Sequence, residues 1–328
     1  MKQSAAQVPI HTYQRKAAIA SGEVRDHAGS VAVVPIKDFD LNRTIFNTLE
    51  GRLPRYVMQT RIAKQVHWRA EDRQAIESAY QRSSRGVDLP QIEPELIRFM
   101  VDECDFDVEH ADGSFLDHLY FCYEYTHHYF PDHSPLVMLL HSILGTGTNT
   151  FAMTAEKMPR LRELVNEFEW RHIEAFPTVL RLLYDGGIRS DLWANLQRLH
   201  ELQSVHFHRV IDNQPLVMSA QDFWIQLNYQ MIHLIDFLPV ANWSTHLNDT
   251  SFIVFRDLFG LLMKAGRQQA QIGYQEPGGA KPIGESQGMA SRLISLIPVK
   301  LSEKMAAKSI RKFSAQIEHS LAYELVWS

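Results

Sequence analysis

The spacing of apolar and polar positions is helical over most of the chain. From Ser114 to Tyr123, apolar residues recur at intervals of three and four, which places them on one face of a helix. Leu136–Leu140 is wholly apolar, so it predicts a helix that is buried on all sides, and the glycines at 145 and 147 should end it. Similar patterns predict helices at Met158–Tyr184, Asp191–Asp212, Ala220–Phe237 (ended by Pro239) and Ser251–Gln269, and one or two more within residues 289–328.

The N-terminal quarter follows a weaker pattern. Residues 1 to about 45 read as irregular, apart from the β-like run Val31–Ile36, which Pro35 interrupts. Leu41–Trp68 turns helical, and Glu71–Ser84 predicts a polar helix. Convincing β-alternation is absent from the rest of the chain. The predicted fold class is therefore all-α, a multi-helix bundle with an irregular N-terminal arm.

Composition sets the domain boundaries and excludes some classes of protein. We expect an arm with packed helices at 1–94, a helical core at 95–274, a Gly/Pro-rich linker loop at 275–288 and C-terminal helices at 289–328. A formal charge of −5 argues against a nucleic-acid-binding protein. Two cysteines in 328 residues favour a reducing, cytoplasmic location. No run approaches the roughly 20 apolar residues of a membrane span.

Two histidines attract attention because of where they fall in these patterns. His118 lies within a helix that has a strong apolar face, and His141 follows the buried run Leu136–Leu140. Burying an imidazole without a partner costs on the order of 1–3 kcal/mol. A metal ion, a carboxylate or a backbone carbonyl would therefore be expected beside His141. The simplest alternative for both residues is a core histidine bonded to a neighbouring backbone group.

These residues also carry a family resemblance. The stretch from His110 through Ser114-Phe115-Leu116-Asp117-His118-Leu119, with Leu139-Leu140-His141-Ser142-Ile143-Leu144-Gly145-Thr146, resembles the HD-domain superfamily, in a branch where His-Ser-Ile-x-Gly-Thr replaces the His-Asp motif. It covers roughly residues 105 to 240. The resemblance implies an HD-like bundle in which a first histidine and a His-Asp pair bind metal. A late aspartate completes such sites, a role open to Asp236 or Asp249.

Ser142 departs from the superfamily pattern and shapes the expected chemistry. It stands where the resemblance implies a metal-bridging aspartate, and a neutral hydroxyl is a poorer ligand than a carboxylate for a hard divalent ion. One metal held by imidazoles, iron or manganese, then fits better than two. Phosphate hydrolysis usually needs a bridging carboxylate and cationic groups. An oxygenase-type reaction on a small-molecule substrate is therefore preferred to phosphohydrolase activity.

A second pattern supports a rival site. Glu124-Tyr-Thr-His127 and Glu169-Trp-Arg-His172 are Glu-x-x-His motifs, whose members share a helix face. Two such motifs on facing helices, with further carboxylates such as Glu201, make a di-iron oxygenase site. The alternative is that both motifs occur by chance, because Glu and His are frequent in this chain, and that Glu124 and His127 are simply solvated.

Further polar residues could complete a site around His141. His200, Glu201, His206 and His208 fall on one predicted helix, where they form a solvated face or supply one ligand. The loop Gly145–Thr150 is rich in hydroxyls and could bind a substrate, although it also reads as a helix C-terminal cap. The candidate catalytic residues are His118, His141, Ser142, Thr146 and Glu169, and the candidate metal ligands are His110, His118, His141, His172 and His208.

The sequence thus predicts a metal-dependent enzyme, an oxidoreductase or a hydrolase, and it allows a homo-oligomer. A third hypothesis follows from Ser142: a metal-free, degenerate HD-like domain that binds a ligand or a partner protein. The basic residues of the last helix, from Lys300 to Lys312, could contact an acidic surface or simply be solvated.

Overall fold

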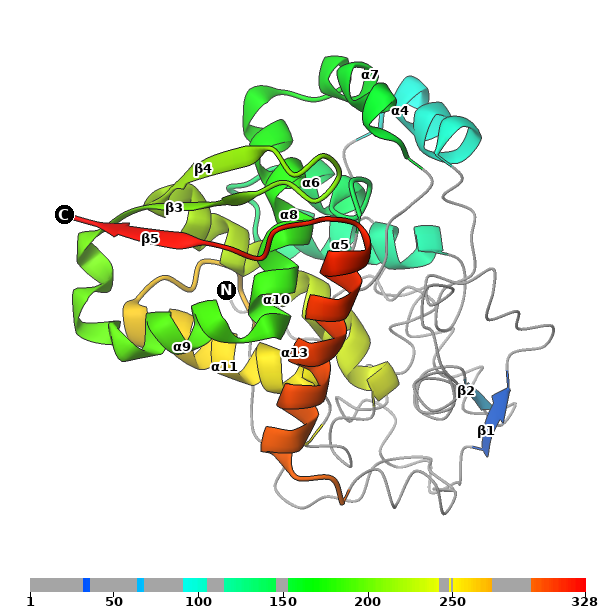
Figure 1. Cartoon of the computed structure of the whole chain (residues 1–328). Helices are drawn as coiled ribbons and strands as arrows, with labels where there is room; N and C mark the ends of the chain where they lie inside the picture. The colour runs from blue at the N-terminus through cyan, green and yellow to red at the C-terminus, as the bar shows by residue number, and fades with distance from the viewer. Residues whose placement is uncertain are drawn as a thin grey trace.

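The structure is a computed structural model and is mostly helical (Figure 1). It describes residues 32–35, 64–67, 91–104, 115–145, 153–241, 248, 250–272 and 296–328. Within these ranges only the backbone is described for residues 32–35, 64–67, 101, 115–118, 120–121 and 236–241. The predicted helix at Glu71–Ser84 and the predicted linker at 275–288 lie outside the described residues.

The first described elements include the predicted β-like run. β1 (Ala32–Pro35) pairs antiparallel with β2 (Lys64–His67). The prediction of helix for Leu41–Trp68 was therefore wrong at its C-terminal end. Four helical segments follow, in agreement with the expected start near residue 95 and near Ser114: α4 (Pro94–Arg98), the π-helix η2 (Phe99–Glu103), α5 (Phe115–Tyr129) and α6 (Leu136–Leu140).

The long helix predicted at Met158–Tyr184 is two helices. After the 3-10 turn η3 (Ala155–Lys157), α7 (Met158–Glu163) ends before a turn, and α8 (Glu167–Asp185) begins anew. Asn166 caps α8: its side-chain oxygen accepts from the backbone N–H of Glu169, and the Glu169 carboxylate accepts from the backbone N–H of Asn166. The capping box makes the break, which apolar periodicity alone does not reveal.

A small sheet replaces part of another predicted helix. α9 (Gly187–Ala194) and the 3-10 helix η4 (Leu196–Glu201) lead into β3 (Leu202–His208). β3 lies between β4 (Pro215–Ser219) and β5 (Glu324–Trp327), antiparallel to both, along one side of the helices (Figure 1). The prediction of one helix over Asp191–Asp212 was wrong, because β3 occupies part of that range. The prediction that residues 289–328 contain only helices was also wrong, because β5 lies near their end. Val205 and Phe207 are buried and Ser204, His206 and His208 are half-buried, which is the alternation of a strand.

Three more helices complete the bundle: α10 (Ala220–Ala241), α11 (Thr250–Ala265) and α13 (Val299–Gln316). α10 continues past Pro239, so the prediction that this proline ends the helix was wrong by two residues. α13 packs along α8, and α10 packs against α5, α8 and α11. Gln230 on α10 donates to the carbonyl of Phe176 on α8 at 3.0 Å, which fixes the two helices against each other near the middle of each.

The core is built mainly from α8, α10 and α11. Their facing apolar residues are fully buried together with Val205 and Phe207 of the sheet. Val137, Met138, Leu139 and Leu140 are wholly buried, as the apolar run predicts. Leu325 and Trp327 of β5 pack on the same core, so β5 is part of the same folded unit as the helices. Among the helices that the structure describes, none is long and apolar enough to cross a membrane.

Candidate functional site: a buried histidine pair

His141 is the centre of the candidate site. It follows α6 directly and is fully buried. Its Nδ1 lies 2.6 Å from the carbonyl oxygen of Met138, three residues earlier. Because a carbonyl only accepts, Nδ1 carries the hydrogen and donates. The expectation of a core histidine bonded to neighbouring backbone is confirmed for this nitrogen, and in the neutral tautomer with its hydrogen on Nδ1 the other nitrogen, Nε2, is an acceptor.

That second nitrogen faces another histidine. His233 Nδ1 on α10 lies 2.9 Å from His141 Nε2, across 92 residues of sequence. His233 is only 6% exposed. The Phe176 ring packs on both imidazoles, with ring centroids 4.7 Å from His141 and 5.5 Å from His233. Residues from α8, α10 and the end of α6 therefore converge on two buried nitrogens that point at each other.

Sequence reasoning missed His233 as the partner of His141. The available signal was a histidine in a helix stretch whose neighbours Met231, Ile232 and Leu234 are apolar; all three are buried. Such a position calls for a partner for the same reason as His141. The pattern could not say which partner. Asp236 follows His233 by three residues on α10, but its side chain lies outside the described residues, as does Asp249.

Other predicted members of this site are only partly described. Ser142 is next to His141 and 2% exposed, and its carbonyl accepts from the N–H of Gly145. Gly145 has a φ of 123°, which explains why the helical turn stops there, as predicted. His118 lies within α5, but its side chain is not described; His110 and Thr146 lie outside the described ranges altogether.

The motif at Glu169 serves a structural purpose. One oxygen of the Glu169 carboxylate accepts from Ser134 Oγ at 2.7 Å and the other from the backbone N–H of Asn166 at 2.8 Å. These contacts tie the start of α8 to the turn before α6. Both oxygens of the carboxylate are thus engaged in capping and bracing the helix.

His172, three residues later, is bound to α10. Its Nδ1 lies 2.8 Å from Gln226 Oε1, and its Nε2 lies 3.8 Å from Asp222 Oδ1. The neighbouring His172 ring, the Ser219 hydroxyl and Arg171 lower the pKa of Asp222 to about 2. His172 is fully buried, so this polar group joins α8 to the start of α10.

Glu124 is half-buried, which differs from the expected solvated position. One of its carboxylate oxygens is buried and has no hydrogen-bond partner, and burial raises the pKa of Glu124 to about 7. A carboxyl group with this pKa can gain or lose a proton near neutrality. His127, the other member of its motif, is half-buried.

The histidines predicted to share a helix face lie around β3 instead. His200 belongs to η4 and its side chain is exposed, whereas His206 and His208 point to the same side of the strand. The His208 carbonyl accepts from Thr178 Oγ1 at 2.6 Å and from His319 Nε2 at 3.0 Å. Burial is the main cause that lowers the pKa of His319 to about 4, so this ring is neutral at pH 7.

The described parts of the chain contain no group of three or more histidine, cysteine, aspartate or glutamate side chains placed to hold one metal ion. His141, His172 and His208 are therefore not brought together as one ligand set. Within the described residues, no three of Glu124, His127, Glu169 and His172 form such a group either. Of the predicted histidine-rich centre, the described residues show His141, and its neighbour is His233, which was not predicted.

Searches against protein-family models, curated proteins and solved structures find no match to this chain.

Proposed function

We propose that this protein is a metal-dependent enzyme of HD-domain-like fold, which holds one iron or manganese ion with His141 and His233 and acts on a small molecule. The observation that carries the proposal is the approach of two buried imidazole nitrogens from different helices to 2.9 Å. Two imidazole nitrogens bound to one metal at about 2.1 Å each lie roughly 3 Å apart. The pair is therefore close to the spacing that a shared ion requires.

The surroundings of His141 support a ligand role. A metal-binding histidine usually donates its other ring N–H to a carbonyl or carboxylate, which fixes the tautomer and the ring orientation. Met138 O accepts in this way from His141 Nδ1. Phe176 packs against both rings and restricts their rotation. Both features prepare the two nitrogens before an ion arrives, and the burial of the pair keeps bulk water away.

Burial also limits the substrate. His141 is fully buried and His233 almost so, which means that a small molecule can reach them more easily than a loop or helix of another macromolecule. Ser142 offers a hydroxyl and no charge beside His141, so a second, carboxylate-bridged ion lacks its usual ligand. A bound iron supplies redox chemistry and manganese Lewis-acid chemistry. We therefore favour an oxygenase-type reaction over phosphate hydrolysis.

Metal content tests this proposal. Wild-type protein from iron- and manganese-supplemented cultures, purified without chelators, should contain about one metal per chain. His141→Ala and His233→Ala should each lower this at least fivefold. His200→Ala is the control, because the side chain of His200 is 73% exposed. Circular dichroism must show that the variants are folded. A wild-type content below about 0.2 per chain, or equal content in all variants, contradicts the proposal.

A metal-free function has one specific observation in its favour. The same 2.9 Å is an ordinary hydrogen-bond distance, with His233 Nδ1–H donating to His141 Nε2. The pair would then be a polar element in the core of a domain that binds a ligand or a partner protein. Chelation separates the two functions: a fall in melting temperature on adding EDTA rejects the metal-free one, and an unchanged temperature supports it.

A further inference from the structure

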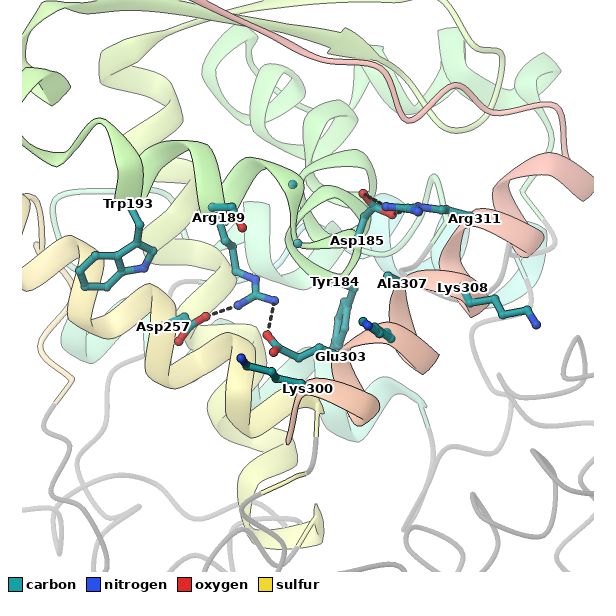
Figure 2. A pocket seen from close by; sticks show the side chains of 14 residues that line it. Tyr184, Asp185, Arg189, Trp193, Asp257, Lys300, Glu303, Ala307, Lys308 and Arg311 are labelled. Atoms are coloured by element: carbon teal, nitrogen blue, oxygen red, sulfur yellow. Dashed lines mark hydrogen bonds and ion pairs between the residues drawn. The ribbon is translucent and has the colours of Figure 1, made fainter. Parts of the chain in front are cut away.

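A groove lies on the side of the molecule formed by α13. It is bordered by the turn between α8 and α9, by α11 and by α13, and has a volume of about 660 Å³ (Figure 2). Sites for small ligands commonly occupy 300–1,000 Å³, roughly this size. Tyr184 and Trp193 provide aromatic walls. The Tyr184 hydroxyl is hydrogen-bonded to Ser251 Oγ at 2.8 Å, which fixes that ring in place.

Each carboxylate that lines the groove is paired with an arginine. Arg189 forms ion pairs with Asp257 and with Glu303, and the side chain of Arg189 is only 7% exposed. Arg311 binds Asp185 at 2.6 Å. Figure 2 shows Arg189 between its two acidic partners and Arg311 beside Asp185. Two arginines therefore pair with three carboxylates, which leaves one net negative charge among these five groups, and three lysines that line the same groove make its total charge positive.

The three lysines lie on one face of α13. Lys300, Lys304 and Lys308 follow each other at intervals of four residues, all exposed and all lining the groove. In the described part of the chain, none of the three has an ion-pair partner within 4.0 Å. Like charges at this spacing repel each other along a helix. An anion placed among them would relieve that repulsion.

The opposite wall adds backbone donors. α9 starts at Gly187, and the first N–H groups of a helix have no acceptor within the helix, which favours a bound anion. Gly186 has a φ of 88°, a backbone conformation that residues other than glycine rarely adopt. A Cβ atom on Gly187 would lie 3.1 Å from the Tyr323 hydroxyl. A side chain at Gly186 or Gly187 would therefore crowd Arg189 or Tyr323.

We propose that this groove binds a phosphorylated small molecule, with its phosphate among Lys300, Lys304 and Lys308 and its organic part against Tyr184 and Trp193. The inference is independent of the histidine pair, since no residue of that pair lines the groove. Aromatic walls, paired acidic groups and unpaired lysines fit an organic phosphate better than a large polyanion, because the space accommodates one small molecule.

Calorimetric titration of the whole protein with pyrophosphate, at low ionic strength, tests the proposal. Lys304→Ala should weaken binding about tenfold, the effect of losing one charge-assisted contact. Lys312→Ala is the matched control: Lys312 continues the same row on α13 but does not line the groove, and it should change the affinity less than twofold. Lys304 is exposed, so the melting temperature should stay the same in that variant.

Three results would overturn the groove as a phosphate site. One is the absence of heat of binding at millimolar pyrophosphate. Another is equal weakening by Lys304→Ala and Lys312→Ala, which means a diffuse basic helix face. The third is sedimentation of the protein with phosphatidylserine vesicles but no binding of pyrophosphate, which identifies α13 as a lipid-binding surface.

Discussion

At the scale of single residues, the buried polar groups differ in how fully they are hydrogen-bonded. His141 has one nitrogen satisfied by Met138 O and the other aimed at His233. Glu169 has both oxygens engaged in a helix cap. Glu124 is the contrasting case, because one buried oxygen lacks a partner. The same residue type therefore braces a helix in one place and has a pKa raised by burial in another.

The raised pKa of Glu124 predicts a pH-dependent stability. In the folded state the pKa is about 7, above the ordinary value of 4.5, so folding favours the protonated carboxyl. The stabilising effect is complete below pH 4.5 and is lost as the pH rises through 7. Glu124→Gln keeps the neutral form at every pH. Its free energy of unfolding should exceed that of wild type above pH 7 by on the order of 2 kcal/mol.

Urea denaturation at pH 5 and pH 8 measures this difference. Glu156→Gln is the control, because Glu156 is an exposed carboxylate. If Glu124→Gln gains no stability at pH 8 relative to wild type, the assignment of a raised pKa to Glu124 is wrong.

At the scale of secondary-structure elements, caps and ties orient the helices around the histidine pair. The Asn166–Glu169 capping box starts α8, and Ser134 joins that start to the turn before α6. Gln230 joins α8 to α10 beside Phe176. Because His141 follows α6 and His233 lies on α10, the positions of these three helices determine the distance between the two nitrogens.

Glu169→Ala separates a capping role from a metal-binding role. The variant removes two hydrogen bonds and leaves the N–H of Asn166 without its acceptor, so it should lower the free energy of unfolding by about 1–3 kcal/mol. Metal content should remain that of wild type. Glu167→Ala, two residues earlier on an exposed part of the same turn, should cost less than about 1 kcal/mol. Loss of metal from Glu169→Ala alone would revive the di-iron hypothesis.

At the scale of the whole molecule, segments far apart in sequence complete each structural unit. β3 pairs with β5, so that Val205 lies opposite Leu325. His141 Nε2 lies beside His233 Nδ1. The central cluster of buried side chains joins residues from α5 to the loop after α11, with β5 packed against it. The candidate site is therefore a property of the assembled bundle.

The sequence predicted the features that depend on local pattern. The apolar run Leu136–Leu140 is a helix that is buried from Val137 onward, His141 bonds to nearby backbone, and Gly145 stops the turn. It failed where long-range pairing decides. Val205 and Phe207 alternate with His206 and His208 as a strand does, but that strand is stabilised by a partner at the other end of the chain. The role of His233 was hidden for the same reason.

Anomalous X-ray scattering from crystals of iron- or manganese-loaded protein tests the central claim most directly. Data on both sides of the metal absorption edge locate the ion and identify the element. We predict one anomalous peak at about 2.1 Å from both His141 Nε2 and His233 Nδ1, with His141 Nδ1 still donating to Met138 O. Two histidines in direct hydrogen bond with no peak between them, in protein exposed to excess metal, would contradict a metal-dependent function for this site.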